Sequence, residues 1–271
     1  MRPSGDAAAH AVAAFRFPIL ADWLRDCTRR RSGHRVKPIV VIPTYNEIEN
    51  LDRIVGLVRE QPGGFHILIV DDNSPDGTGR LADELVRRHP GEIHVLHREC
   101  KEGLGRAYVA GFGHVLKMPE YDAIIQMDAD LSHDPAYLPE FMKHLETRDM
   151  VLGSRYLNGI SVVNWDFKRL ILSKGASQYV KLITSMPYSD ATGGFKAWRR
   201  EALNAIGLDQ LFSNGYLFQI ETTYRLHSMK RFSIGEISII FRDRDLGRSK
   251  IAFPIIIEAV WGVIRLRLTG R

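Results

Sequence analysis

Two carboxylates lie in a position where they could bind a metal ion. Asp128 and Asp130 directly follow an apolar run at residues 123–127 and are separated only by Ala129. Alternate side chains of an extended segment point to the same side, and hard carboxylate oxygens suit Mg²⁺ or Mn²⁺. Such an ion bridges diphosphate oxygens and stabilises a departing nucleotide. The alternative is a pair of loop aspartates that cap the next helix. Their position after a buried strand favours the metal site.

A second acidic cluster follows an earlier apolar run. The segment 71–78 contains Asp71, Asp72 and Asp76, and Glu47 follows a still earlier run. Because Asp, Asn, Pro and Gly all favour turns, the segment has an alternative interpretation as a simple turn. A turn does not explain why a second carboxylate group ends a neighbouring strand, where ribose hydroxyls or base N–H groups would supply hydrogen-bond donors.

The segments that must position these carboxylates alternate between two patterns. Short β-branched runs are separated by stretches with helical spacing, which predicts parallel βαβ units and an α/β fold. Ligands of such sheets bind at the carboxyl ends of the strands, where the carboxylates stand. Asn46 is expected to cap the first helix. The expected strands cover 39–42, 67–70, 93–96 and 123–127, and the expected helices 51–58, 81–86 and 106–117.

The pattern changes after residue 155. Long helical stretches are expected at 167–186 and 199–206. The apolar and basic mixture at 165–174 suits a helix in a membrane interface, with ordinary core packing as the alternative. The final stretch, 251–268, is apolar with basic residues near its end and suits the same setting.

Composition limits the classes of partner and compartment. The chain has 271 residues, 45% of them hydrophobic, so one elaborated domain is expected. Its 37 Lys and Arg against 32 Asp and Glu favour phosphates or anionic lipids and do not indicate nucleic acid. Cys27 and Cys100 form no ligand motif, which fits a reducing cytosol. We expect neither a membrane-spanning run nor a signal peptide.

Three regions are expected along the chain. Residues 1–36 are Ala-rich and then strongly basic, and they form an N-terminal extension. Residues 37–250 form the catalytic domain. Residues 251–271 form the amphipathic C-terminal segment at a membrane interface.

Several motifs in this order resemble a known family. The segments at 41–47, 70–74, 128–130 and 153–156 resemble glycosyltransferase family 2. Within that family, the further segments at 74–78, 128–133, 192–196 and 241–250 are similar to polyprenyl (dolichyl) phosphate mannosyltransferases. The resemblance spans nearly all of residues 36–250, and this ordered set is more specific than any single motif.

The resemblance implies a fold, a reaction and a set of ligands. It implies a GT-A fold, Rossmann-like, with a mostly parallel sheet flanked by helices and with peripheral interface helices. Mannose would pass from GDP-mannose to a polyprenyl or dolichyl phosphate with inversion, in the presence of Mg²⁺ or Mn²⁺. By position, the guanosine would contact Pro43, Tyr45, Glu47 and Asp71, and the diphosphate and metal would contact Asp128, Ala129 and Asp130. Some members carry Gln where this chain has Ser132, which is therefore a candidate ligand.

The resemblance also implies basic residues for the acceptor. A lipid phosphate is already an anionic nucleophile, so it needs positioning and charge balance more than a general base. The phosphate-binding candidates are Arg155, Arg169, Arg244 and Lys250, with Arg244 also a catalytic candidate. Asp190 is a candidate sugar contact, or alternatively a turn or cap residue.

Two other functions remain open at this stage. The shared carboxylates do not read the sugar, so a UDP donor of glucose or N-acetylglucosamine is an alternative. A nonenzymatic sugar-nucleotide-binding module that docks on membranes is a second. For the main hypothesis we expect a peripheral protein on the cytoplasmic face of a membrane, with a membrane anchor subunit as a candidate partner.

Overall fold

The computed structural model describes residues 36–242 and 253–269, and the side chains of the last helix from residue 259 onward. The chain divides after Val36, and Lys37–Arg271 form one compact unit. Apart from Val36, the predicted extension 1–36 lies outside the described residues. The same holds for the predicted phosphate ligands Arg244 and Lys250.

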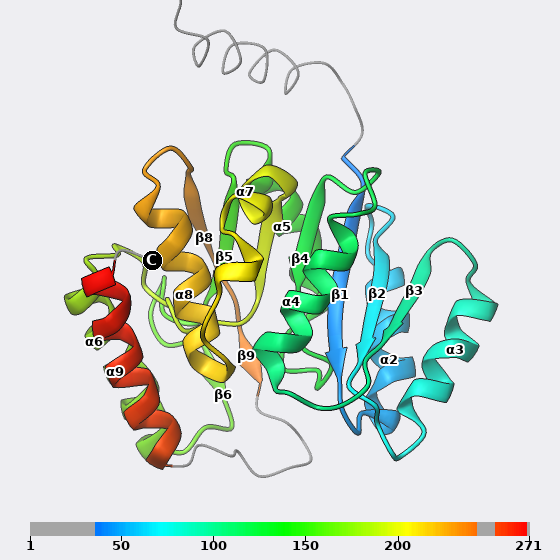
Figure 1. The fold of residues 1–271 in the computed structure, drawn as a ribbon, viewed down its shortest axis with the longest axis horizontal. Coiled ribbons are helices and arrows are strands. Elements are labelled where there is room, and N and C mark those ends of the chain that lie inside the picture. Colours follow the sequence, from blue (N-terminus) through cyan, green and yellow to red (C-terminus); the bar gives the residue numbers. More distant parts are fainter. Residues whose placement is uncertain (1–35, 243–252, 270–271) are drawn as a thin grey trace, which may run out of the picture. The chain divides into compact units, whose positions relative to one another are not determined.

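A seven-stranded sheet forms the centre of the described unit (Figure 1). Its order is β3-β2-β1-β4-β7-β5-β8. Strand β7 is antiparallel to both of its neighbours, and the other pairs are parallel. The strands are β1 (Pro38–Thr44), β2 (His66–Asp71), β3 (Ile93–His97), β4 (Ala123–Gln126), β5 (Met150–Ser154), β7 (Lys196–Arg199) and β8 (Ile234–Ser238). A small second sheet pairs β6 (Val162–Val163) with β9 (Phe241–Arg242).

Helices cover both faces of the sheet, which is why the central strands are apolar throughout. In β1, Val40 and Ile42 pack in one core, while Ile39 and Val41 pack in the core of the opposite face. This matches the two-residue alternation of a strand that is buried on both sides. One face carries α2 (Ile48–Arg59), α3 (Thr78–Arg88) and α5 (Leu138–Leu145); the other carries α4 (Leu104–Val115), α7 (Arg200–Ala205) and α8 (Gly215–Ser228). Short 3₁₀ turns occur at Pro135–Tyr137 and Leu208–Gln210.

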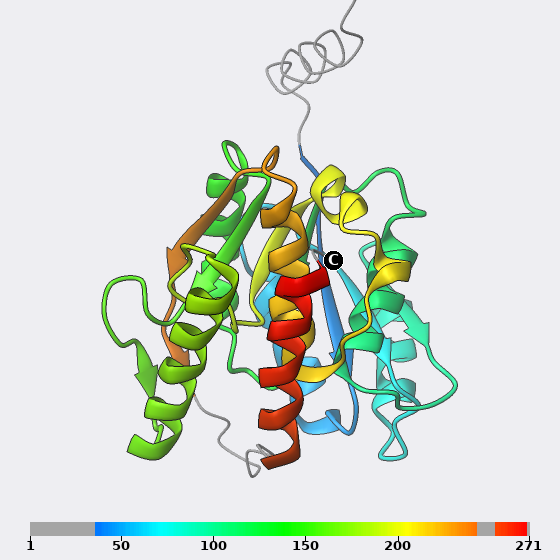
Figure 2. The same ribbon diagram turned by 60° about the vertical axis from the view of Figure 1, so that its left-hand side comes forward.

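Two further helices pack beside α8, away from β1 and β2. Helices α6 (Phe167–Thr184) and α9 (Phe253–Thr269) contact each other, and their apolar side chains form a third core with α8 (Figure 2). Gly262 lies where α9 approaches α8, and a Cβ there would lie 2.2 Å from Leu217 Cδ2, so the Leu217 side chain would have to move. Within the described ranges, no helix is long and apolar enough to cross a membrane.

The expected cap at Asn46 is wrong. Asn46 adopts the left-handed conformation with φ 60°, and the N-cap position belongs to Glu47, whose side chain makes no capping bond. The Asn46 backbone N–H instead donates to Ser74 Oγ at 3.1 Å. The turn after β1 is therefore shaped by the turn after β2, which local sequence patterns do not reveal.

A buried lysine links β7 to α8. Lys196 is fully buried, and its ammonium donates to Gln219 O at 2.6 Å, Thr223 Oγ1 at 3.1 Å and Thr222 Oγ1 at 3.3 Å. Burial lowers the pKa of Lys196 to about 7, and the nearby charge of Asp190 opposes this shift. The folded protein therefore releases the Lys196 proton at a lower pH than the unfolded chain does.

This pKa predicts a pH-dependent stability. Between pH 7 and 10.5 the unfolded chain holds a proton on Lys196 that the folded chain has released. Stability should therefore fall as pH falls through this window, by about 1.4 kcal/mol per pH unit. The difference in unfolding free energy between wild type and Lys196→Met, from urea titrations, should carry this slope. The control variant Lys143→Met, at an exposed site, should show the same dependence of unfolding free energy on pH as the wild type. If the wild type and Lys196→Met also show the same pH dependence, the lowered pKa of Lys196 is contradicted.

Candidate active site

The predicted carboxylates meet because several strand ends share one edge of the sheet. β1, β2 and β4 run parallel, so Glu47, Asp71 and Asp128 follow strand ends on the same side. Because β7 is antiparallel, the segment that precedes it also reaches this edge. The glycines at 193–194 thus join a site whose other members come from the first half of the chain.

Asp71 is held by the turn that follows it. Only 3% of its surface is exposed, and it accepts hydrogen bonds from Ser74 Oγ at 2.6 Å, Ser74 N at 3.3 Å and Thr44 Oγ1 at 3.3 Å. A Cβ on Gly79 would lie 2.7 Å from Asp71 Oδ2, so this position requires glycine. The predicted turn therefore exists, and it fixes a carboxylate.

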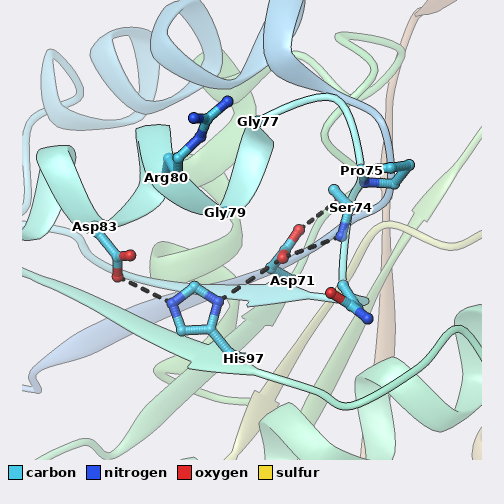
Figure 3. A pocket seen from close by; sticks show the side chains of 9 residues that line it. Asp71, Ser74, Pro75, Gly77, Gly79, Arg80, Asp83 and His97 are labelled. Carbon is cyan, nitrogen blue, oxygen red and sulfur yellow. Dashed lines mark hydrogen bonds and ion pairs between the residues drawn. The ribbon is translucent and has the colours of Figure 1, made fainter.

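A pocket of about 310 Å³ opens beside Asp71 (Figure 3). His97 crosses it from β3, with one ring nitrogen 3.8 Å from Asp71 Oδ2 and the other 2.9 Å from Asp83 Oδ1. The lining is mostly polar, which suits the hydroxyl and N–H groups of a nucleoside. The residues around it are Asp71, Asn73, Ser74, Pro75, Gly77, Gly79, Arg80, Asp83 and His97.

The other predicted nucleotide ligands lie at the neighbouring turn. The ammonium of Lys101 stands 3.6 Å from the centre of the Tyr45 ring. The backbone N–H of Glu47 donates to Thr78 Oγ1 at 3.0 Å, and its carboxylate accepts from Asn50 Nδ2 at 2.8 Å. Pro43 is buried within β1. The structure therefore brings Tyr45 and Glu47 to the segment that holds Asp71, whereas Pro43 lies within β1, before the turn.

Asp72 pairs with a residue that the sequence analysis did not identify. Its carboxylate accepts from Arg98 Nη1 at 2.5 Å, and Arg98 also pairs with Glu102. Burial raises the pKa of Asp72 above its ordinary value, and Arg98 opposes this shift. The separation of 26 positions in the sequence explains why local sequence gave no signal of the pair.

Asp128 is oriented by two groups from other elements. Its Oδ1 accepts from the Tyr108 hydroxyl at 2.7 Å, and its backbone N–H donates to His133 Nδ1 at 3.0 Å. Burial and the charge of Asp128 raise the pKa of Tyr108 well above its ordinary value, so the phenol remains a donor. Since Nδ1 of His133 is an acceptor, a neutral ring carries its proton on Nε2.

Asp130 is oriented by the turn that follows it. Its Oδ1 accepts from Ser132 Oγ at 2.6 Å and from Ser132 N at 3.1 Å, and Leu131 between them adopts φ 63°. The Ser132 hydroxyl, a predicted metal ligand, therefore donates to the Asp130 carboxylate in this structure. A ligand role for this hydroxyl stays a prediction.

The donor set fits a hard divalent cation that binds together with a substrate. Among the described residues, no group of three or more His, Cys, Asp or Glu side chains could hold a metal alone. Mg²⁺ and Mn²⁺ commonly take one or two carboxylates from the protein and the remaining oxygens from phosphate and water. Asp128 and Asp130 meet that requirement, because their carboxylates stand at one turn and the Asp128 side chain is 25% exposed.

Arg155 and Asp190 form a buried ion pair. Arg155 donates from Nε to Asp190 Oδ2 at 2.6 Å, from Nη2 to Asp190 Oδ1 at 2.8 Å and from Nη2 to Thr192 Oγ1 at 2.9 Å. Burial alone would raise the pKa of Asp190, but the Arg155 charge holds it below its ordinary value. In this structure Asp190 orients Arg155, a contact that neither interpretation of Asp190 anticipated.

Arg155 and Arg169 stand near the same indole ring. Their guanidinium carbons lie 5.4 and 4.3 Å from the centre of the Trp165 ring. The structure thus brings these two predicted phosphate ligands together. Their binding of phosphate stays a prediction, as do the roles of Arg244 and Lys250 outside the described residues.

Comparison with known proteins identifies the family. The model of the family "Glycosyl transferase family 2" matches residues 39–207, which is more than half of the chain. The chain belongs to glycosyltransferase family 2. The predicted family is therefore confirmed.

Two curated proteins align with most of the chain. A polyprenol monophosphomannose synthase of Mycolicibacterium smegmatis is 44% identical over 87% of this chain and 88% of its own length. An undecaprenyl-phosphate mannosyltransferase of Micrococcus luteus is 42% identical over 87% of this chain and 96% of its own length.

Solved structures share the fold at low sequence identity. The glucosyl-3-phosphoglycerate synthase of Mycobacterium tuberculosis, in complex with Mn²⁺, UDP and glucosyl-3-phosphoglycerate, superposes with a TM-score of 0.60. It is 16% identical, over 89% of this chain and 81% of that one. A mannosyltransferase of Pyrobaculum calidifontis, in complex with GDP-Man and Mn²⁺, has a TM-score of 0.55 and 17% identity over 92% and 77% of the two chains. The predicted α/β GT-A fold is confirmed.

The Arg155–Asp190 pair predicts a large loss of stability when one partner is removed. Asp190→Asn should lower the unfolding free energy by about 3–5 kcal/mol, because it leaves a buried guanidinium without its counter-charge. Urea denaturation would measure this loss. The matched variant Asp52→Asn, which removes the exposed partner of Arg88, should cost at most about 1 kcal/mol. Equal losses in the two variants would contradict the buried pair.

Proposed function

We propose that this chain transfers mannose from GDP-mannose to a polyprenyl phosphate, with inversion at the anomeric carbon. The observation that carries the proposal is the placement of Asp128 and Asp130 at the same sheet edge as the Asp71 pocket. Two proteins named for mannosyl transfer to such lipids, 44% and 42% identical to this chain, support the choice of sugar and acceptor.

The proposed donor site extends from β2 to β4. The guanosine would contact Tyr45, Glu47 and Asp71, with Pro43 beneath them, and the diphosphate would reach the turn at 128–130. The distantly related P. calidifontis mannosyltransferase was solved with GDP-Man and Mn²⁺, which supports the choice of nucleotide and of a divalent ion.

A divalent cation held by Asp128 and Asp130 would neutralise charge on the departing diphosphate. Tyr108 and the 128–133 turn hold these carboxylates in place. This preformed orientation lowers the barrier, because carboxylates that are already in place need not reorganise during the reaction. Ser132 is the candidate for a further ligand.

The proposed reaction is a single displacement. An oxygen of the acceptor phosphate attacks C1 of mannose from the face opposite the diphosphate, forming one C–O bond while the C1–diphosphate bond breaks and its electron pair leaves with GDP. The acceptor is already ionised, so no general base is needed. We propose that Arg155, Arg169, Arg244 and Lys250 hold the acceptor phosphate, with Arg244 also a candidate for a catalytic role.

We also propose that α6 and α9 bring the enzyme to its lipid as a peripheral protein on the cytoplasmic face of a membrane. Both helices expose large apolar side chains, with Phe167 at 74%, Leu182 at 79%, Trp261 at 68% and Leu268 at 80% exposure. Lys and Arg side chains accompany them, a mixture that favours anionic lipid surfaces. A membrane anchor subunit remains a candidate partner.

Transfer of labelled mannose tests the proposed function directly. Purified protein with Mn²⁺ or Mg²⁺ should convert GDP-mannose and a short polyprenyl phosphate to a mannosyl lipid, and EDTA should abolish the product. Competition with GDP and UDP would identify the nucleotide. Transfer only from UDP-sugars would replace the donor, and nucleotide binding without any transfer would favour the nonenzymatic module.

Asp130→Ala tests the metal site. Transfer should fall by at least about 100-fold because the leaving diphosphate loses its charge balance, while thermal unfolding still reports a folded protein. Asp134→Ala, in the same loop, removes only a cap on Ala136 N and should keep turnover near the wild-type value. Full activity of Asp130→Ala would remove the metal argument.

Replacement of Phe167 and Leu182 by Ser tests the membrane face. The double variant should bind vesicles that contain anionic lipid several-fold more weakly, because less apolar surface enters the bilayer. Its kcat with a short, water-soluble acceptor should stay near the wild-type value. Unchanged cosedimentation with vesicles would place the docking surface elsewhere.

A further inference from the structure

A Cβ-sized space, called the hollow below, lies beside Gly194 and is bordered by His133, Gln219 and Asp128. It exists because residue 194 is glycine: the position of a Cβ there lies 3.4 Å from His133 Cε1, 3.5 Å from Gln219 Nε2 and 3.7 Å from Asp128 Oδ2. A metal-site carboxylate and a side-chain amide therefore face one point. No local sequence pattern points to Gln219.

Gln219 is buried but keeps its donor end unused. Only 4% of its surface is exposed, and its Oε1 accepts from Gln126 Nε2 at 2.7 Å. In the described part of the chain, Nε2 donates to no protein group. In the described residues, the fully buried side-chain atoms without a partner are Gln126 Oε1, Trp165 Nε1 and Trp198 Nε1. Nε2 of Gln219 is therefore open to solvent, and a ligand that accepts from it would replace water there.

The donor is held rigidly. Gln126, on the adjacent β4, fixes the amide through Oε1, and Lys196 fixes the backbone by donating to the Gln219 carbonyl at 2.6 Å. The carboxylate across the hollow favours the orientation with the NH₂ end toward it. A preorganised donor costs little entropy when a ligand arrives.

The hollow fits a hydroxyl group. Among the described residues, Asp128 Oδ2 accepts no hydrogen bond, and His133 Nδ1, which itself accepts from the Asp128 backbone N–H, stands 3.9 Å away. One acceptor and one donor facing the same point complement a hydroxyl, which donates to the carboxylate and accepts from the amide. An ionised phosphate oxygen would meet only repulsion from Asp128 there.

The sheet order assigns the hydroxyl to the sugar. Asp71 ends β2, whereas Asp128 follows β4 and Gly194 precedes β7, on the other side of β1. A nucleotide that reaches from Asp71 to Asp128 would project its sugar beyond Asp128, toward β7 and α8. We propose that Gln219 donates a hydrogen bond to one hydroxyl of the transferred sugar, with Asp128 accepting from the same hydroxyl. This inference rests on the proposed function.

Two variants test the contact by different routes. Gln219→Met removes the donor at similar volume. Gly194→Ala fills the hollow, and its Cβ would make only ordinary contacts at 3.4–3.7 Å, so folding should be retained. Both should lower kcat/KM with GDP-mannose about tenfold, the loss expected for one buried hydrogen bond. Binding of GDP alone should stay within about twofold of the wild type, because GDP lacks the sugar.

Deoxymannose donors identify the hydroxyl. With the wild type, one of the 2-, 3-, 4- or 6-deoxy analogues of GDP-mannose should lose about tenfold or more in kcat/KM. With Gln219→Met that analogue should lose clearly less, and the remaining penalty reflects the contact with Asp128. Gln219→Glu, which keeps an acceptor for Gln126 but lacks the donor, should behave like Gln219→Met and serves where the latter fails to fold. Gln61→Met and Gly113→Ala, matched changes away from the site, should leave both readouts unchanged.

The outcomes separate this inference from the function it rests on. If the deoxy analogue lowers kcat/KM by the same factor in the wild type and in the Gln219 variants, the hydroxyl contact is overturned. The proposed mannosyl transfer would be unaffected by that result. Parallel losses of GDP and GDP-mannose binding would assign Gln219 to the nucleotide or to folding and overturn it as well. A wild type that transfers no mannose from any donor would instead defeat the proposed function itself.

Discussion

The site depends on the register of the strands at one edge of the sheet. Parallel pairing of β1 with β2 and β4 ends three apolar strands on the same side, and each end continues into a polar turn. The antiparallel β7 delivers its preceding glycine segment to the same edge. Every contact proposed for the donor follows from this arrangement, because the residues concerned are far apart in the chain.

Such an edge gathers negative charge, and the fold balances it in several ways. Asp71 is satisfied by hydroxyl and backbone donors, Asp72 by Arg98, and Asp190 by Arg155. Asp128 instead receives a neutral phenol on one oxygen and leaves the other facing the hollow at Gly194. Asp72 and Asp190, which have cationic partners, thus serve structure, whereas Asp128, with a neutral phenol on one oxygen, can attract a cation or a hydroxyl.

The region that holds α6, α8 and α9 connects the site to the surface. Gln219 and Leu217 lie on one helix, the first at the sugar side of the site and the second against Gly262 of α9. Lys196 of β7 joins this helix to the sheet through its hydrogen bond to the Gln219 carbonyl. The proposed lipid-facing helices are therefore packed onto the same element that supplies the proposed sugar contact.

The sequence by itself determined the strands, their alternation with helices, the α/β class and the family, because these depend on local periodicity and on motifs of adjacent residues. It also identified Asp71, Asp128 and Asp130, since each follows an apolar strand. The cap at Asn46 was wrong, and Arg98, Tyr108 and Gln219 were missed, because their partners lie 20 to 93 residues away. Only the tertiary structure decided that Arg155 pairs with Asp190, that Lys196 is buried, and that Gln219 faces Asp128. Each depends on which strand and helix faces meet, and local spacing carries no record of that.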